Sequence, residues 1–111
     1  MAEYLPSRGD VVWLDFDPQA GREQAGRRPA LVVSPLAYNQ ITGLMLVCPI
    51  TSHVKGFRFE VPVPPELPIR GVILADHLKS ADWRARRAEH ICHLPGNCVL
   101  EVIARIQPLI T

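Results

Sequence analysis

Aromatic residues and an excess of positive charge are both scarce in this sequence. Only 6% of its 111 residues are aromatic, which argues against a broad stacking platform for single-stranded nucleic acid. Twelve Lys and Arg residues stand against 11 Asp and Glu residues, and the formal net charge is +1. A protein that coats nucleic acid through charge alone is therefore excluded, whereas a local basic patch is not.

The sequence also lacks a long hydrophobic run and a regular framework of cysteines. The longest apolar stretch, residues 44–50, is far shorter than the ~20 residues of a membrane span and contains Pro49. No basic flank followed by an apolar core opens the chain, so we expect no secretory signal. The three cysteines are odd in number and irregularly spaced, which is typical of a reducing compartment. We therefore expect a cytoplasmic protein with no membrane partner.

Length and composition predict a single domain over residues 1–111. Hydrophobic residues make up 48% of the chain, which argues against intrinsic disorder. A chain this short buries a modest share of its surface, so it is either marginally stable alone or supported by a partner subunit.

Turn-forming residues follow one another at short intervals, which favours short strands over long helices. Residues 10–17 are rich in residues that favour β-strands. In residues 57–63 the odd positions are apolar, and the even positions are polar or proline, which is typical of a half-buried strand. We expect the third strand to end at Pro49 and Thr51. The predicted strands cover residues 10–17, 30–33, 44–50, 57–63 and 71–75, together with a long edge strand over 83–91 that carries Arg84 and Arg86 on one face.

Two helices complete the prediction. Ser34 is the expected cap of a short helix near residues 35–42, and Gly43 is expected to end it. Apolar residues recur at helical spacing over 99–106, with Asn97 as the expected cap and Pro108 as the expected end. Five or six short strands with one terminal helix indicate a small, strongly bent β-barrel.

Two segments concentrate positive charge. The first is the loop over residues 18–28, which has three positive charges and one negative charge: Arg22, Arg27, Arg28 and Glu23. This excess of arginine suits an anionic ligand, but it is also typical of a solvated hairpin tip. The second, residues 79–87, holds Trp83 among basic residues, which is typical of a nucleic-acid surface or of an edge strand protected by charge.

Other patterns are weaker. His90, Cys92, His93 and Cys98 are potential zinc ligands, but on a strand His90 and Cys92 share a face while His93 points away, so we expect no metal site. His53 and His77 are isolated in sequence; either could serve as a general base, but isolated histidines are more often surface residues. The sequence contains neither a nucleophile elbow nor a Gly-rich phosphate loop.

One loop of the chain reads Glu-Gln-Ala-Gly-Arg-Arg-Pro, over residues 23–29. It belongs to a set of motifs spread over nearly the whole chain, at residues 9–18, 23–30, 33–35, 38–39, 48–52, 55–56, 71–76, 79–80 and 83–86. In combination these motifs resemble the MazF/PemK family of toxins, and the enteric MazF type most closely; the loop over residues 23–29 is the most specific part of the resemblance.

The resemblance implies an mRNA interferase, the toxin of a type II toxin–antitoxin system that inhibits translation and growth. Family members have a small SH3-like β-barrel that is shared with the CcdB toxins. They cut single-stranded mRNA at short sequences without a metal ion or cofactor, and they leave 2′,3′-cyclic phosphate and 5′-hydroxyl ends. The resemblance also implies a homodimer and a cognate MazE-like antitoxin, and the enteric likeness suggests an ACA-like cleavage site.

The resemblance assigns the catalytic roles to Arg28, Thr51 and Glu23. Guanidinium and hydroxyl groups suit a phosphate that gains charge in the transition state. Arginine is a poor base because its pKa lies above ~12, so Glu23 and Arg28 both remain candidates for the general base. The residues predicted to contact RNA are Arg22, Arg27, Asn39, Lys55, Lys79, Ser80, Trp83, Arg84 and Arg86.

Two rival functions use the same barrel. A CcdB-like toxin that binds gyrase or another topoisomerase would not need the set of Arg28, Thr51 and Glu23. A non-catalytic RNA-binding barrel would keep the basic segments and tolerate the loss of Arg28. Apolar residues of the 44–50 strand and of the 99–106 helix exceed what one small barrel needs inside, so we expect them to form a two-fold interface between subunits.

Overall fold

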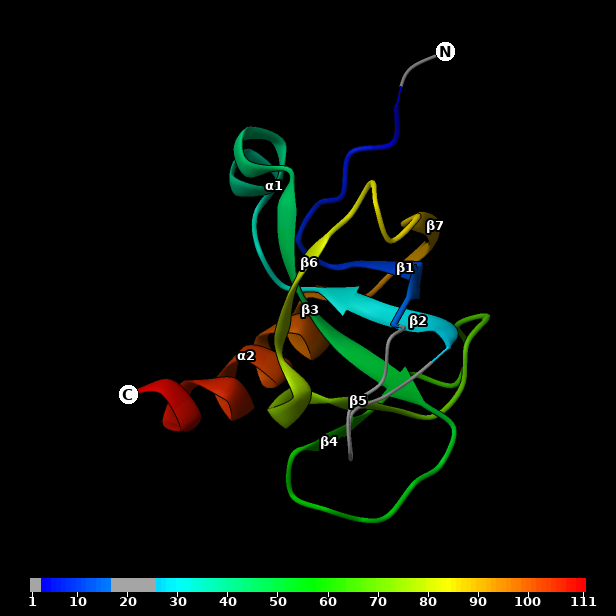
Figure 1. The fold of residues 1–111 in the computed structure, drawn as a ribbon. Helices are drawn as coiled ribbons and strands as arrows, with labels where there is room; N and C mark the ends of the chain where they lie inside the picture. Colours follow the sequence, from blue (N-terminus) through cyan, green and yellow to red (C-terminus); the bar gives the residue numbers. More distant parts are fainter. Residues whose placement is uncertain (1–2, 17–25) are drawn as a thin grey trace.

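A computed structural model describes residues 3–16 and 26–111 of the chain. Within these residues a single strongly bent antiparallel sheet carries the fold, with strand order β4-β5-β3-β2-β1-β7 and with β6 paired to β3 (Figure 1). The predicted mainly β fold with one short and one C-terminal helix is confirmed. The strands are β1 (Asp10–Asp15), β2 (Arg27–Val32), β3 (Leu44–Thr51), β4 (Glu60–Pro62), β5 (Val72–Leu74), β6 (Lys79–Asp82) and β7 (Glu89–His93).

The central strand β3 is paired along both edges. One edge pairs with β2 over Val47–Pro49, and the other pairs first with β6 and then with β5. Side chains alternate between its faces, so that Cys48 and Ile50 join the core cluster under the C-terminal helix while Met45 and Val47 join a second cluster around Trp83. Most apolar residues of β3 are therefore buried in the core of their own subunit. This corrects the expectation that many of them remain exposed for an interface between subunits.

Two prolines that were expected to mark the limits of strands lie inside them instead: Pro49 was expected to end the third strand, and Pro29 to precede the second. Pro49 lies within β3 because it falls in the gap between the β6 pairing, which ends at Val47, and the β5 pairing, which begins at Ile50. Pro29 lies within β2, which starts at Arg27 instead of residue 30. Hydrogen bonds alternate along an antiparallel strand, and this alternation turns the amide position of Pro29 toward β3. Because proline has no N–H, the β2–β3 ladder stops at Ala30 and Pro49.

The short helix α1 (Leu36–Thr42) ends as predicted at Gly43, whose φ of 73° is left-handed. Its N-cap is Pro35, and the prediction that Ser34 caps it is wrong. The Ser34 hydroxyl instead donates to Oδ1 of Asn39 at 2.5 Å and accepts the N–H of Leu46 at 2.8 Å. This serine ties α1 to β3 from inside the molecule.

The predicted edge strand over 83–91 is wrong for residues 83–88, and only its last part lies in an edge strand, β7. The carboxylate of Asp82 accepts the backbone N–H groups of Arg84 at 3.1 Å and Ala85 at 2.9 Å, which turns the chain at the end of β6. Arg87 adopts a φ of 55° in the same turn, and β7 begins only at Glu89. The expected strand over 57–63 shrinks to β4, since the chain before it forms a turn closed by Glu60 N–H and the carbonyl oxygen of Phe57 at 3.1 Å.

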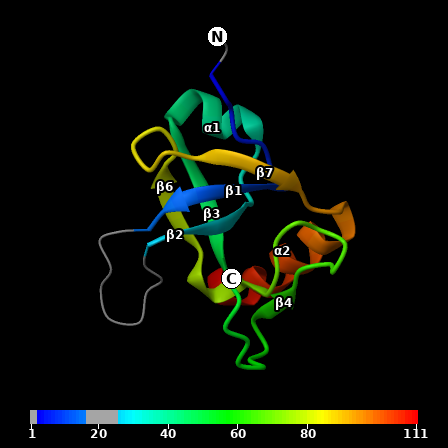
Figure 2. The same ribbon diagram turned by 90° about the vertical axis from the view of Figure 1, so that its right-hand side faces the viewer.

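The 3₁₀ turn η1 (Ala75–His77) follows β5, and the helix α2 (Gly96–Ile110) ends the chain. Val99, Val102 and Ile106 are buried on one face of α2, as their spacing predicted. Pro95, not Asn97, caps it, and Pro108 lies within it. Proline is tolerated there because it falls in the last turn, where only one backbone hydrogen bond is lost. Figure 2 shows α1 above β1 and β7, and α2 below these two strands. No helix among the described residues is long and apolar enough to cross a membrane.

We expect Gly71→Ala to destabilise the protein by about 2 kcal/mol or more. Gly71 has a φ of 117°, and a Cβ there would overlap the carbonyl oxygen of Thr51 and lie 2.9 Å from Cα of Ser52. Thermal and urea unfolding measure the change. Gly96→Ala is the matched control, since its Cβ would meet nothing within 4 Å. Equal stability of the two variants would contradict the close approach of residue 71 to β3.

Candidate active site

Arg28 and Thr51 face each other at the open end of the β2–β3 ladder. The last pair of that ladder is Ala30 and Pro49, and two further residues along each strand bring Arg28 opposite Thr51 on the same face of the sheet. Both side chains are half-buried and line one pocket of about 520 Å³. Residues 23 positions apart in the sequence are thus neighbours because of the strand register.

The pocket combines positive charge with proton-exchanging groups. Arg28 and Lys55 supply cationic heads, which favour an anionic ligand such as a phosphate. Its remaining walls come from the segment after β3, from β4 and β5, and from η1. They are lined by His53, Phe57, Glu60, Leu74, Asp76 and His77.

Two of these lining residues, His53 and His77, are isolated in sequence but come together at the pocket, where His53 is exposed, as expected of a surface residue, and His77 is half-buried. His77 reaches the pocket from η1, and His53 follows Thr51 at a distance of two residues. The His53 backbone N–H donates to the Thr51 hydroxyl at 3.1 Å. The sequence held a signal for this grouping: Thr51, His53 and Lys55 are spaced by two residues, and an extended segment places such residues on the same side.

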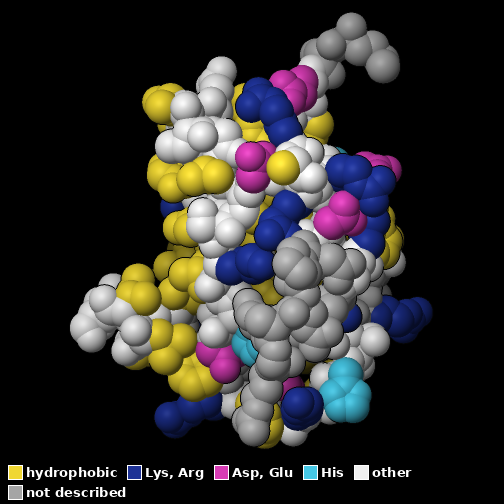
Figure 3. Space-filling model, viewed as in Figure 1, with side chains coloured by type: hydrophobic (Ala, Val, Ile, Leu, Met, Phe, Trp, Pro, Cys, Tyr) yellow, Lys and Arg dark blue, Asp and Glu magenta, His cyan; other side chains and the backbone are white. Residues whose placement is uncertain are grey.

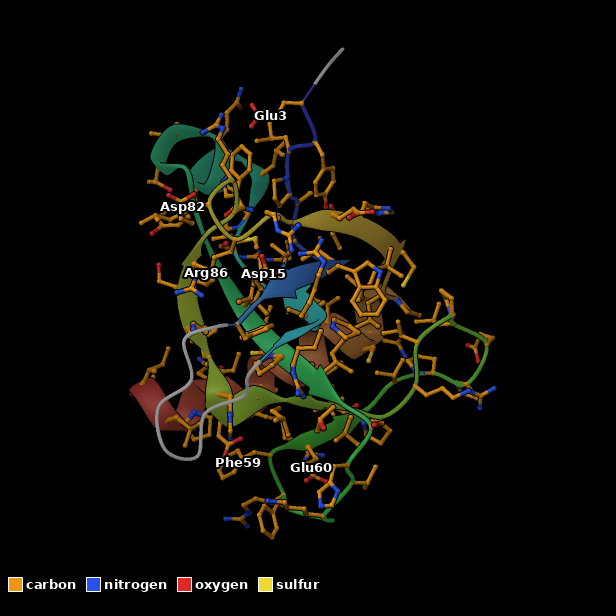
Figure 4. The ribbon with its side chains drawn as sticks, turned by 45° about the vertical axis from the view of Figure 1, so that its right-hand side comes forward. Glu3, Asp15, Phe59, Glu60, Asp82 and Arg86 are labelled. Atoms are coloured by element: carbon orange, nitrogen blue, oxygen red, sulfur yellow. The ribbon has the colours of Figure 1, made fainter. Side chains whose placement is uncertain are left out.

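The wall that carries Lys55 is held by a buried carboxylate. Glu60 is only 9% exposed, and its carboxylate accepts the N–H of Gly56 at 2.9 Å and the N–H of Lys55 at 3.2 Å from each oxygen. Gly56 adopts a φ of 79° in this turn. The Lys55 ammonium group lies 5.9 Å from the centre of the Phe57 ring. Glu60 therefore fixes the shape of the loop between β3 and β4 (Figure 4).

Arg27, next in sequence to Arg28, points to the opposite face of β2. Its guanidinium donates to Asp15 and to Glu89, each at 3.1 Å, and to the carbonyl oxygen of Arg87 at 2.8 Å. Hydrogen bonds from Arg87 and then Arg27 lower the pKa of Asp15. Arg27 is thus held by carboxylates of β1 and β7, and this ion-pair network opposes its predicted role in RNA contact.

The second basic segment forms a separate surface at the other end of the sheet. Lys and Arg side chains gather over β6 in Figure 3. The Lys79 ammonium lies 5.5 Å from the centre of the Phe16 ring, and Ser80 beside it is exposed. Arg84 is paired with both carboxylate oxygens of Glu3 and stacks 4.2 Å from the Trp83 ring. Arg86 lies against Asp15 and donates to its carbonyl oxygen at 3.1 Å (Figure 4).

Comparison with known proteins decides the family. The family model described as PemK-like, MazF-like toxin of type II toxin–antitoxin system matches residues 7–110. The endoribonuclease toxin MazF of Escherichia coli (strain K12) is 50% identical over 88 residues, which is 79% of this chain and 78% of that protein. The chain belongs to the PemK-like, MazF-like toxin family.

Solved structures of this family agree in fold. MazF from Deinococcus radiodurans has a TM-score of 0.94 at 54% identity and covers 97% of this chain and 98% of its own. A MazE–MazF crystal form from the same organism has a TM-score of 0.88 at 52% identity over 96% of this chain and 97% of its own. A mycobacterial endoribonuclease in complex with its antitoxin shares only 19% identity with a TM-score of 0.75, which shows the common fold alone.

Within this MazF-like fold, two residues predicted to contact RNA are interior. The Asn39 side chain is fully buried, and its amide donates to the carbonyl oxygens of Pro6 at 2.9 Å and Ser34 at 3.1 Å. Trp83 is 3% exposed, and its indole N–H donates to the carbonyl oxygen of Asn39 at 2.9 Å. Both predictions are corrected, because these side chains hold α1 against the sheet and leave no surface for a ligand.

Two members of the predicted site, Arg22 and Glu23, lie outside the described residues. For them the assignments remain those implied by the family resemblance.

The histidines near the end of β7 surround a buried carboxylate. A bulge between Val11 and Val12 shifts the β1–β7 register. In consequence His90 and His93 both approach Asp10, at 3.8 and 3.0 Å, instead of pointing apart as expected. Burial raises the pKa of Asp10, but hydrogen bonds from Tyr4 and His93 outweigh it and leave that pKa lowered. No group of three His, Cys, Asp or Glu residues in 3–16 and 26–111 is arranged to hold a metal ion.

We expect Glu60→Gln to loosen the loop between β3 and β4 and to destabilise the protein by about 1–3 kcal/mol. An amide oxygen can replace one acceptor, but the new NH₂ group would face the backbone donors of Lys55 and Gly56. Amide hydrogen exchange of these two residues should accelerate more than exchange in the core strands. Glu101→Gln on α2 is the control, since Glu101 pairs only at the surface with Arg105. Unchanged exchange at Lys55 and Gly56 would contradict the role given to Glu60.

Proposed function

We propose that this toxin is an endoribonuclease that cleaves single-stranded mRNA at a short sequence in the cytoplasm and thereby inhibits translation and growth. The observation that carries the proposal is that Arg28 and Thr51, which the strand register brings opposite each other, line one pocket together with Lys55. It is supported by family membership and by relatives that are named endoribonucleases, among them the MazF and ChpB toxins of Escherichia coli.

The proposed reaction needs no external nucleophile. The ribose 2′-oxygen attacks the adjacent phosphorus, the bond from phosphorus to the 5′-oxygen breaks, and the products carry a 2′,3′-cyclic phosphate and a 5′-hydroxyl. Charge develops on the non-bridging phosphate oxygens, where the Arg28 guanidinium can donate two charge-assisted hydrogen bonds. The Thr51 hydroxyl can donate a further bond, since it accepts the His53 N–H and keeps its own proton. We propose that the reaction is independent of metal ions.

Proton transfer has several candidate groups. The 2′-hydroxyl must lose a proton and the departing 5′-oxygen must gain one. Glu23 and Arg28 are the two candidates implied by the family, and the pocket adds the imidazoles of His53 and His77. Imidazole titrates near neutral pH, which makes it chemically better suited to exchange a proton than a guanidinium.

Two protein partners complete the proposal. A MazE-like antitoxin is expected because the Deinococcus relative was solved as a MazE–MazF complex. A homodimer is expected because apolar side chains remain exposed along one flank from α1 to α2 (left in Figure 3). The most exposed are Ile41 at 83%, Ile110 at 72% and Leu100 at 68%. Elution as a monomer at micromolar concentration would contradict the dimer.

We expect Arg28→Ala to lower the cleavage rate by at least about 100-fold, because it removes the donors aimed at the phosphate. The fold should stay intact, since the backbone pairing of Arg28 with Leu14 of β1 does not depend on the side chain. Arg58→Ala is the matched control, an exposed arginine in the neighbouring loop that does not line the pocket. Wild-type rates for Arg28→Ala would sink the site assignment and favour a non-catalytic RNA-binding barrel.

The decisive experiment is cleavage of a long single-stranded RNA by the purified, antitoxin-free protein in the presence of EDTA. We expect discrete cuts at one short sequence with 5′-hydroxyl ends, mapped by primer extension, and an ACA-like sequence is the first to test. Intact RNA from demonstrably folded protein would overturn the proposal, and gyrase would be the next target to assay. Activity that is lost with EDTA and restored by added metal would overturn metal independence alone.

A further inference from the structure

A second hollow adjoins the Arg28–Thr51 pair. It has a volume of about 430 Å³ and is lined by residues of β1 and β2, by the end of β3 and by the chain that precedes β5. Arg28 and Thr51 line both this hollow and the first pocket, so the pair stands at the border between the two. The other residues that line the second hollow are Trp13, Pro29, Ile50, Ser52, Pro68, Ile69 and Arg70.

Trp13 is the feature of this hollow that the core does not explain. Its side chain is 39% exposed, whereas Trp83, the second tryptophan, is 3% exposed. On β1 it stands opposite Pro29 of β2, whose ring adds a flat apolar neighbour. An indole that is left open beside a proline and a cationic side chain, here Arg70, has the composition of a stacking site for a planar ring.

From these observations we propose that the hollow around Trp13 binds the base of a nucleotide next to the scissile phosphate. The inference rests on the proposed function, because it takes the phosphate to lie at Arg28 and Thr51. Since the hollow begins at that pair, the base of an adjoining nucleotide is within reach of it. Single-stranded RNA is recognised through unstacked bases that lie on aromatic faces or guanidinium planes. The 6% aromatic content forbids a broad platform but not a single stacking residue at the cut.

The strand pairing at Trp13 favours a base over a segment of protein. An extended peptide commonly binds by adding a strand to an open sheet edge. Trp13 has no such edge beside it, since its strand is paired with Pro29 on one side and with Glu89 on the other. A planar base needs only the indole face and one or two polar groups, such as Ser52 and Arg70, both of which line the hollow.

The test crosses a protein substitution with a substrate substitution. Once the wild-type cleavage sequence is mapped, each nucleotide flanking the cut is replaced in turn by an abasic nucleotide, and kcat/KM is measured with wild type and with Trp13→Leu. Leucine keeps the apolar contact with Pro29 but cannot stack. We expect one flanking abasic substitution to lower kcat/KM of the wild type about tenfold. Trp13→Leu should lose about as much on the intact RNA, and the same abasic substitution should then have little further effect.

Controls separate the outcomes. Trp13→Phe should restore most of the loss, and Tyr38→Ala, which removes an aromatic side chain of equal 39% exposure on α1, should leave kcat/KM unchanged. Additive effects of Trp13→Leu and the abasic nucleotide would overturn the inference, as would wild-type kinetics together with weakened binding of the antitoxin, which would make the hollow a peptide site. If Trp13→Leu does not fold, Arg70→Gln takes its place in the same cross. Failure of the wild type to cleave any RNA would instead contradict the proposed function.

Discussion

The missing amide hydrogen of Pro29 is the constraint on which the arrangement of the site depends. At this position β2 turns its hydrogen-bonding side toward β3, and a proline cannot donate there. The ladder ends at Ala30 and Pro49, and the next residues of both strands are left at its open end. Arg28 and Thr51 thus combine a rigid backbone on one side with open space on the other, which suits side chains that must hold a fixed geometry around a ligand.

Charge in this protein is largely balanced within the fold before any ligand arrives. Arg27 and Arg87 share the Asp15 carboxylate, and Arg84 is paired with Glu3. These exposed pairs contribute little to stability but occupy the cations that a sequence-based count credits to a nucleic-acid surface. A net charge of +1 therefore does not translate into a continuous basic face over the described residues.

The sequence predicted the fold class, and it pointed to Arg28 and Thr51, which the structure brings to one pocket, but it did not predict what surrounds them. Helical spacing located the buried face of α2, and the family motif pointed to Arg28 and Thr51. Alternation along β2, which sends Arg27 to Asp15 and Arg28 to the pocket, could be anticipated only once the strand was known to begin at Arg27. The interior positions of Asn39 and Trp83 depend on the packing of α1 against the sheet, and the turn after Asp82 depends on a carboxylate that caps two amides. Such long-range and side-chain-to-backbone contacts have no periodic signature in the sequence.

The core strand β3 and the loops around it differ in how freely their sequences can change, and this affects how the specificity of such a toxin can evolve. Thr51 ends a strand whose other residues form the core on both faces, so changes near it are costly to the whole fold. The loop held by Glu60 and the chain from Pro68 to Arg70 lie outside the ladder and contribute pocket walls without carrying the core strand. Under the proposed function, substitutions in these walls would change which nucleotides bind and would leave Arg28 and Thr51 in place. The residues that would set the recognition sequence can therefore vary separately from Arg28 and Thr51, which the sheet holds in place.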